Sequence, residues 1–382
     1  MTVIESTGSG GWSTGGIWSG GISRAGNEHD VVIKSEHNVT ISQDEQANSL
    51  TILSGGTLTI SGSTRKIRID SEADGTGDTI NGNAVSLQGD IVESAGGKLR
   101  LDIETPAATN VDLVPNSGTV HDLVINHASA VVNLRSAHTT ISGDLTITAG
   151  ELETNNSGSN INLTVAGNTV VTDTLTGNNS TLIFGTSGVH GPTESGALHV
   201  ESSGSLTFGS GDLTAFSGFT AKGTNTVTST GGGDIKIKGR TNNGFMNSHN
   251  HKGVNITGDY IIDFDDNGLH DVRNNMAITA ANINYPHGGR TYKFWTTATD
   301  STVTFTGNFN VSNGTATVNT QDSGREATDV FTVTGDTTLT GDLIANDTTI
   351  NFGSLTIGSN GEYSSTSGTT TILGSSGGFA LL

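Results

Sequence analysis

The sequence has no cysteine, only 4 prolines and few aromatic residues (5%). Without cysteine the fold can contain neither a disulfide nor a thiolate metal site, so backbone hydrogen bonds and packed side chains must stabilise it. Hydrophobic residues make up 32%, which is little for a conventional globular core in a chain of 382 residues. Charged residues make up only 14%, however, and this argues against a disordered chain.

Basic residues are also scarce, because 17 Lys and Arg stand against 37 Asp and Glu for a formal net charge of −20. Phosphate backbones are bound by clusters of Lys and Arg, so we predict no nucleic-acid partner. No stretch approaches the roughly 20 apolar residues of a membrane-spanning helix, and we predict no membrane span. Residues 1–6 lack the basic and apolar regions of a secretory signal, which favours a protein assembled in the cytoplasm.

What the chain has instead is 54 glycines and a recurring phrase of two apolar residues around a polar one. Such a phrase places both apolar side chains on one face, the period-2 pattern of a half-buried strand, while the intervening Gly, Ser, Asn and Asp favour turns. The phrases lie at 39–41, 50–52, 58–60, 67–69, 145–147, 163–165, 206–208, 303–305 and 355–357. We therefore predict an all-β fold, a right-handed parallel β-helix (β-solenoid). A β-sandwich array is the alternative, but it favours longer strands and fewer glycine pairs.

The pattern divides the chain into four predicted segments. Residues 1–30 hold Trp12 and Trp18 among paired glycines, and we interpret them as a Trp/Gly-rich cap over the first coil or as an attachment arm. The other three segments are a β-solenoid at 31–239, an irregular loop-rich excursion at 240–300, and a further stretch of β-solenoid with the C-terminal end at 301–382.

One group of acids in the third segment is a candidate catalytic site. Glycosidases and lyases built on β-helices use two or three carboxylates from neighbouring strands as proton donor and base or nucleophile. The candidates are Asp263, Asp265, Asp266 and Asp271. The alternative is that they are loop acids beside the turn pair Asn267-Gly268, and no catalytic motif surrounds them. We therefore predict no enzymatic activity.

Histidines in the same segment are candidate metal ligands, since imidazole and nearby carboxylates suit divalent cations. The candidates are His249, His251 and His270, together with His287. Histidines in polar loops more commonly form hydrogen bonds, and we predict no cofactor. The calcium-binding repeats of β-rolls are present only as partial echoes at 231–234 and 74–78, which leaves open an isolated surface calcium site.

The N-terminal part of the chain carries a family resemblance. It contains WSTGGIWSGGI from Trp12, NEHDVVI from Asn27, HNVTI from His37, SLTI from Ser49 and GGTLTI from Gly55. These runs resemble the start of parallel β-helix domains in bacterial adhesins and in structural proteins of marine tailed bacteriophages. The resemblance covers residues 12–60, and it implies a structural or attachment role without catalytic residues to transfer.

From the resemblance we expect a bacteriophage virion structural protein: a head-decorating fibre, tail fibre or spike component that acts as a rigid rod. We expect it on the virion, in contact with other virion proteins, with a host surface glycan as a further candidate partner. Outward rows of Thr and Val favour a homo-oligomer, above all a trimer. The alternatives are a bacterial cell-surface adhesin or extracellular matrix or filament protein, and a polysaccharide-degrading tailspike that uses the acids named above.

Overall fold

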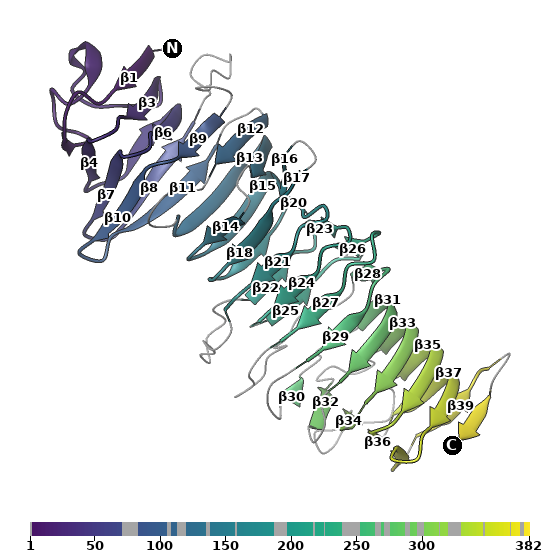
Figure 1. Ribbon diagram of the computed structural model, residues 1–382. Coiled ribbons are helices and arrows are strands. Elements are labelled where there is room, and N and C mark those ends of the chain that lie inside the picture. Colours follow the sequence, from purple (N-terminus) through teal and green to yellow (C-terminus); the bar gives the residue numbers. More distant parts are fainter. Residues whose placement is uncertain are drawn as a thin grey trace. The chain divides into compact units, whose positions relative to one another are not determined.

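A computed structural model shows an all-β fold (Figure 1). The residues that it describes are 2–70, 83–104, 108–112, 120–134, 138–156, 159–186, 197–216, 218–224, 226–238, 253–263, 269–270, 276–286, 291–295, 302–312, 314–319, 330–346, 348–366, 368–374 and 378–382. Within these ranges the one helix is a 3-10 turn, η1 (Ser19–Gly21). No helix in the described part of the chain is long and apolar enough to cross a membrane.

The strands form where the sequence alternates, as the period-2 phrases predict. In β23 (Ser205–Phe208), for example, Leu206 and Phe208 are buried while Thr207 between them is half-buried. Alternate side chains of a strand point to opposite faces, so each phrase gives one face to the core and one to the surface. The prediction of half-buried strands from these phrases is therefore confirmed, except at 50–52, where Thr51 between the two apolar residues is buried as well.

The chain divides into two compact units, Met1–Thr181 and Leu182–Leu382. In the first unit three sets of strands pair in parallel (Figure 1). The first set contains β1 (Thr2–Glu5), β3 (His29–Ile33), β6 (Ser49–Ile52), β9 (Asn83–Leu87), β12 (Ala108–Asp112), the second halves of β13 (Asp122–Leu134) and β15 (Leu145–Glu153), and β20 (Thr174–Thr176). The second contains β2 (Gly10–Gly11), β4 (Asn38–Ile41), β7 (Thr57–Ser61) and β10 (Asp90–Ser94), and separately β14 (His138–Ile141) with β18 (Asn162–Val165). The third contains β5 (Glu45–Ala47), β8 (Thr64–Ile69), β11 (Lys98–Ile103), the first halves of β13 and β15, and β19 (Thr169–Val171). A short hairpin, β16 (Asn155–Asn156) with β17 (Ser159–Asn160), is antiparallel.

The second unit repeats this arrangement, again with parallel pairing (Figure 1). One set contains β23, β26 (Val227–Ser229), β28 (Val254–Ile256), the first halves of β31 (Met276–Tyr285), β33 (Thr302–Val311), β35 (Val330–Leu339) and β37 (Thr349–Ile357), and β39 (Thr370–Ile372). Another contains β21 (Leu182–Phe184), β24 (Leu213–Ala215), β27 (Ile235–Ile237), β29 (Tyr260–Ile262), the second halves of β31, β33, β35 and β37, and β40 (Phe379–Leu381). The remaining strands are β22 (Ala197–Val200) with β25 (Gly218–Ala221), and β30 (Leu269–His270), β32 (Thr291–Trp295), β34 (Thr315–Asn319), β36 (Asp342–Asn346) and β38 (Glu362–Ser365).

In both units a strand pairs with its equivalent one repeat further along the chain, and long parallel sheets result. This is the connectivity of stacked coils, so the fold is compatible with a β-solenoid. The range 240–300, which the sequence analysis set apart as an irregular excursion, contains β28, β29, β31 and β32, all in parallel pairs with their neighbours.

The inward side chains of each unit form its core. In the first unit they are mainly Leu, Ile and Val, whereas in the second unit aromatic rings join them. Phe305 of β33 and Phe331 of β35 are diagonal neighbours, because Phe331 lies opposite Val303 and Phe305 lies opposite Val333. Their ring centroids are 5.2 Å apart, and the ring of Phe309 lies within 5.8 Å of both. Tyr260 is fully buried, which raises the pKa of its hydroxyl above the ordinary value, and this hydroxyl has no hydrogen-bond partner among the described residues.

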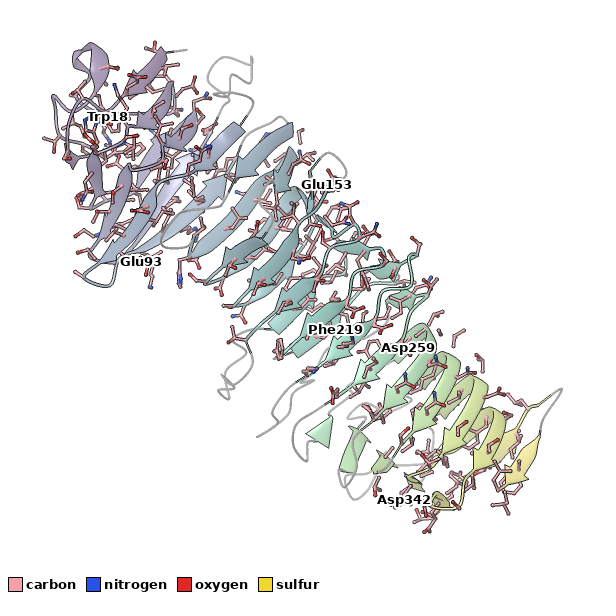
Figure 2. All side chains as sticks on the ribbon, viewed as in Figure 1. Trp18, Glu93, Glu153, Phe219, Asp259 and Asp342 are labelled. Atoms are coloured by element: carbon pink, nitrogen blue, oxygen red, sulfur yellow. The ribbon has the colours of Figure 1, made fainter. Side chains whose placement is uncertain are left out.

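The segment that precedes β3 packs around two tryptophans. Trp12 and Trp18 are both buried, and their rings meet edge to face with centroids 5.3 Å apart (Trp18 is labelled in Figure 2). Trp18 Nε1 donates a 2.8 Å hydrogen bond to the Trp12 carbonyl, and the Trp12 amide donates one to the carbonyl of Thr40 in β4. A buried carboxylate, Glu45, accepts hydrogen bonds from Ser13 Oγ and Arg24 Nε. The segment is thereby fixed to the first strands of the unit.

Candidate functional site

Of the predicted catalytic acids, the structure describes Asp263, which directly follows β29. Its amide donates a 2.9 Å hydrogen bond to the Ile237 carbonyl, and its Oδ2 lies 3.4 Å from Lys238 Nζ. The contact with Lys238, one repeat earlier in the chain, is typical of an ion pair between stacked strands. Asp265, Asp266 and Asp271 lie outside the described residues.

The predicted metal ligands are placed only in part. His270 is the second residue of β30 and pairs with Phe294 of β32. His249, His251 and His287 lie outside the described residues. Among the residues that are described, no group of three or more His, Asp and Glu could hold a metal ion. The metal and calcium hypotheses therefore remain untested predictions.

A row of polar side chains in the second unit lies where the paired strands of one set begin, namely β24, β27, β29 and the second halves of β31, β33, β35 and β37. Each member except the last accepts a hydrogen bond from its equivalent in the next repeat, at distances from 2.6 to 3.2 Å. We call this set the Asx row, and it consists of Asp212, Asp234, Asp259, Asn282, Asn308, Asp336 and Ser354. Its donors are backbone amides in Asp234, Asp259 and Asp336, and side chains in Asn282, Asn308 and Ser354. The row is thus one directional ladder along the unit.

Asp259, which is labelled in Figure 2, is the branch point of the ladder. Its Oδ1 accepts a 2.8 Å hydrogen bond from Asn282 Nδ2, and its Oδ2 accepts a 3.1 Å bond from Asn284 Nδ2. Asn284 Oδ1 in turn accepts a bond from Asn310 Nδ2 at 2.9 Å. Each oxygen of the Asp259 carboxylate therefore accepts a hydrogen bond from the first of two asparagine side chains in successive repeats. Hydrogen bonds to an ionised acceptor are stronger than those between neutral groups.

Glycines next to the Asx row let the repeats approach closely. Gly211, Gly233 and Gly258 each precede an aspartate of the row. A Cβ on Gly233 would overlap the carbonyl oxygen of Gly211, and a Cβ on Gly258 would overlap that of Gly233. A larger residue at these glycines would push the backbones of two successive repeats apart. It would also break the hydrogen bond that the carboxylate of one aspartate accepts from the backbone amide of the next aspartate in the row.

An ion pair begins the row. Lys236 Nζ lies 2.5 Å from Asp212 Oδ2 and 3.9 Å from Asp234 Oδ2. Partial burial alone would raise the pKa of Asp212, but hydrogen bonds from Lys236 and from the Asp234 amide, together with the charge of Lys236, hold it below the ordinary value. The hydrogen bond with Asp212 raises the pKa of Lys236 against the opposing effect of burial. Both groups are consequently ionised near neutral pH.

The first unit contains a shorter row of the same design. Asp122 Oδ1 accepts a 2.9 Å hydrogen bond from the Asp144 amide, and Asp144 Oδ1 accepts a 2.7 Å bond from the Asn168 amide. Gly143 and Gly167 precede Asp144 and Asn168, and a Cβ on Gly167 would overlap backbone atoms of Gly143. In both units, therefore, a glycine followed by an aspartate or asparagine lets successive repeats approach closely and form a hydrogen bond.

Charged side chains concentrate on β8 and β11 of the first unit. Arg100 Nε donates a 2.6 Å hydrogen bond to Asp102 Oδ1, which raises the pKa of Arg100 although partial burial opposes the shift. Lys66 Nζ lies 3.8 Å from Asp102, and Arg68 forms ion pairs with Asp70 and Glu104. These cations are matched by neighbouring carboxylates, so the face is a charge-balanced network.

The Asx rows were missed by sequence reasoning, although a signal for them exists. The triplet Gly-Asp-apolar occurs in the rows at 143–145, 211–213, 233–235 and 258–260, and outside them at 89–91 and 341–343. Chemically, the rows join side-chain oxygens to backbone amides, side-chain amides and the Ser354 hydroxyl. Their arrangement suits the stiffening of a scaffold.

Comparison with known proteins gave no relative: no family model, curated protein or solved structure is significantly similar to this chain.

Proposed function

We propose that the protein is a structural and attachment component of a bacteriophage virion, where it serves as a rigid scaffold for a contact surface. The observation that carries this proposal is the Asx row, which links successive repeats from Asp212 to Ser354 through short polar side chains. A mechanical role needs each repeat to be fixed to the next, and stacked repeats derive their stability from such neighbour contacts. The resemblance of residues 12–60 supplies the virion context.

The proposal includes a right-handed β-helix whose first coil is capped by the segment that bears Trp12 and Trp18. The edge-to-face packing of the two rings and their burial support the cap, because an uncovered first coil would expose apolar surface and unpaired backbone. Other virion proteins are the proposed partners, with a host surface glycan as a further one. Side-by-side trimers would use the outward polar rows of the strands.

The proposal is tested by following the protein through particle purification. Phage particles from the native source are separated on a density gradient, and the chain is quantified in each fraction by mass spectrometry. We expect a constant number of copies per particle across the phage peak. Recovery with the cell envelope or with shed filaments, and none in the phage peak, would contradict the proposal and favour an adhesin or matrix protein.

A second assay addresses the polysaccharide-degrading alternative. Purified protein is incubated with the capsular or surface polysaccharide of the host, and chain length is followed by size-exclusion chromatography. The proposal predicts an unchanged polymer. If the wild-type protein shortens the polymer and the Asp263→Asn variant does not, the scaffold proposal is contradicted and the polysaccharide-degrading tailspike is favoured.

A further inference from the structure

Asparagine followed by glycine is a chemically labile pair in any polypeptide. The backbone nitrogen of the second residue can attack the side-chain amide carbon of the asparagine, and glycine has no Cβ to hinder the attack. The chain contains five such pairs, at 81–82, 243–244, 267–268, 313–314 and 360–361. The pair at 360–361 is the one in which the structure describes both residues.

Asn360 is exposed in the turn between β37 and β38. Within the described part of the chain its side chain forms no hydrogen bond, so the side-chain amide can turn toward the following backbone nitrogen. Asn351 of β37 differs on both counts, because its Nδ2 donates a 3.3 Å hydrogen bond to Thr332 Oγ1 and a phenylalanine follows it. Of these two asparagines, Asn360 alone combines an unrestrained side chain with a following glycine.

The glycine of this pair is fixed by packing. A Cβ on Gly361 would overlap the carbonyl oxygen of Leu339, one repeat earlier in the chain. Substitution by a larger residue would therefore push the turn away from the end of β35. The close approach of the two repeats thus requires the residue that makes Asn360 reactive.

The backbone of the turn opposes the reaction only weakly. The Gly361 amide donates a 2.9 Å hydrogen bond to the Gly358 carbonyl, which closes the turn. Ser359 and Asn360 inside the turn are exposed, so water can replace the carbonyl as the acceptor. A hydrogen bond exchanged with water contributes little net free energy. Breaking this one leaves β37 paired with β35 and β38 paired with β36.

We propose that Asn360 is a site of spontaneous deamidation. The Gly361 nitrogen forms a bond to Cγ of Asn360, the bond from Cγ to Nδ2 breaks, and the amide proton of Gly361 ends on the ammonia that leaves. Water then opens the five-membered succinimide at one of its two carbonyl groups, which gives aspartate or isoaspartate at position 360. Water is the only co-reactant. The inference concerns this turn and goes beyond the proposed function.

Either product changes the start of β38. A new carboxylate at position 360 lies close in sequence to Glu362, the first residue of β38, which is itself opposite Asp342 of β36. Like charges at neighbouring positions of a sheet are destabilising. Isoaspartate also lengthens the backbone by one methylene group just before the strand. We therefore expect β38 to pair less firmly with β36 as the protein ages.

Mass spectrometry of aged protein tests the inference. The full chain is incubated at mildly alkaline pH, which favours loss of the Gly361 amide proton, and samples are cleaved after glutamate. Cleavage releases residues 327–362, which contain both Asn360 and Asn351. At the time when half of Asn360 carries the mass of an acid, Asn351 is expected to be unchanged. Electron-transfer fragmentation, which separates isoaspartate from aspartate, is expected to find both products at position 360.

Two further samples sharpen the test. Asn360→Gln has a side chain one methylene longer, which disfavours ring closure, and its residue 360 is expected to stay an amide over the same time. Protein unfolded in urea gives the rate for the same sequence without the turn. Conversion of Asn360 in urea but not in the folded protein would overturn the inference and show that the turn protects the residue.

Equal conversion of Asn360 and Asn351 in the folded protein would also overturn it, because the surroundings of Asn360 would then make no difference. In either case the virion proposal is unaffected, since particle association is measured separately.

Hydrogen exchange followed by mass spectrometry tests the effect on β38. Aged wild type is expected to exchange the amides of Glu362–Ser365 faster than fresh wild type, whereas aged and fresh Asn360→Gln are expected to match. Aged wild type that has converted Asn360 but exchanges these amides at the original rate would contradict the loosening of β38.

Discussion

The amide of Asp259 donates a 2.9 Å hydrogen bond to Oδ1 of Asp234, which lies 25 residues earlier in the chain. This contact shows how a side chain at the start of one strand fixes the backbone at the start of the next. Along the Asx row, contacts of this kind and equivalent side-chain hydrogen bonds couple successive repeats from Asp212 to Ser354. Hydrogen-bonded members of the row are separated by 18 to 28 residues in the sequence. The hydrogen bond at the start of the strand is therefore kept although the repeats differ in length.

Removing one aspartate of the row should weaken the second unit. Asp234→Ala deletes the acceptor of the Asp259 amide and a partner of Lys236, and we expect a loss of about 1.5 to 3 kcal/mol in the free energy of unfolding. Asp234→Asn keeps Oδ1 and should lose less. Thr214→Ala, at a half-buried outward position of β24, is the matched control and should change stability little. Urea denaturation measures all three, and equal losses for Asp234→Ala and Thr214→Ala would contradict the role of the row.

A methyl group added at a glycine next to the Asx row should destabilise the protein more than one added at the surface. In Gly258→Ala the new Cβ would meet the Gly233 carbonyl, so we expect a loss of about 3 kcal/mol or more from overpacking and the separation of two repeats. Gly8→Ala is the control, since a Cβ there meets nothing within 4 Å. Thermal unfolding followed by circular dichroism compares the two variants. A Gly258→Ala protein as stable as wild type would show that the repeats need not approach so closely.

The tryptophan pair should dominate the stability of the N-terminal segment. Trp18→Ala removes a buried ring and the hydrogen bond to the Trp12 carbonyl, and we expect a loss of about 3 to 5 kcal/mol. Trp18→Phe retains a ring for the edge-to-face contact and should lose substantially less. Protease digestion, with cleavage sites in the first 30 residues read by mass spectrometry, should show early cutting for Trp18→Ala alone. Unchanged digestion of Trp18→Ala would contradict tight packing of this segment.

The ion pair between Lys236 and Asp212 should make stability depend on pH in the acid range. The pKa of Asp212 is lower in the folded protein than its ordinary value of 3.8, so the carboxylate contributes stability above that value, and the contribution is lost as the pH falls through the lowered pKa. Because both side chains are partly exposed, we expect less than about 1 kcal/mol. Urea denaturation of wild type and Lys236→Met at neutral and acid pH isolates the effect. A difference between the two proteins that grows on acidification would reverse the expected sign.

The hydroxyl of Tyr260 should contribute nothing to stability. It is buried without a hydrogen-bond partner among the described residues, and such a group costs about 1 to 3 kcal/mol relative to hydration. Tyr260→Phe should therefore be neutral or stabilising, and Tyr260→Leu, which shrinks the side chain, should destabilise the protein. Melting temperatures distinguish the cases. A marked loss in Tyr260→Phe would reveal that the hydroxyl is bonded after all.

Local features of this fold could be predicted from sequence, and long-range contacts could not. The alternation in Leu206, Thr207 and Phe208 has period 2 and needs no knowledge of neighbours, so the strands were predictable. The contact from Asp259 to Asn282 depends on the length of the intervening repeat, which varies along the chain. A recurring Gly-Asp-apolar triplet indicates the start of a strand, but not which residue of the next repeat the aspartate will bond. For the same reason the acid Asp263 could be singled out, whereas its neighbour Lys238 could not.

The most direct test of the scaffold proposal is cryo-electron tomography of intact phage particles from the native source, with averaging over the positions marked by an antibody against this chain. The account predicts that the antibody labels a regular appendage of the capsid or tail, and that its averaged density accommodates the stacked parallel strands of each unit. Label confined to cell envelopes or detached filaments, with unlabelled particles, would contradict it.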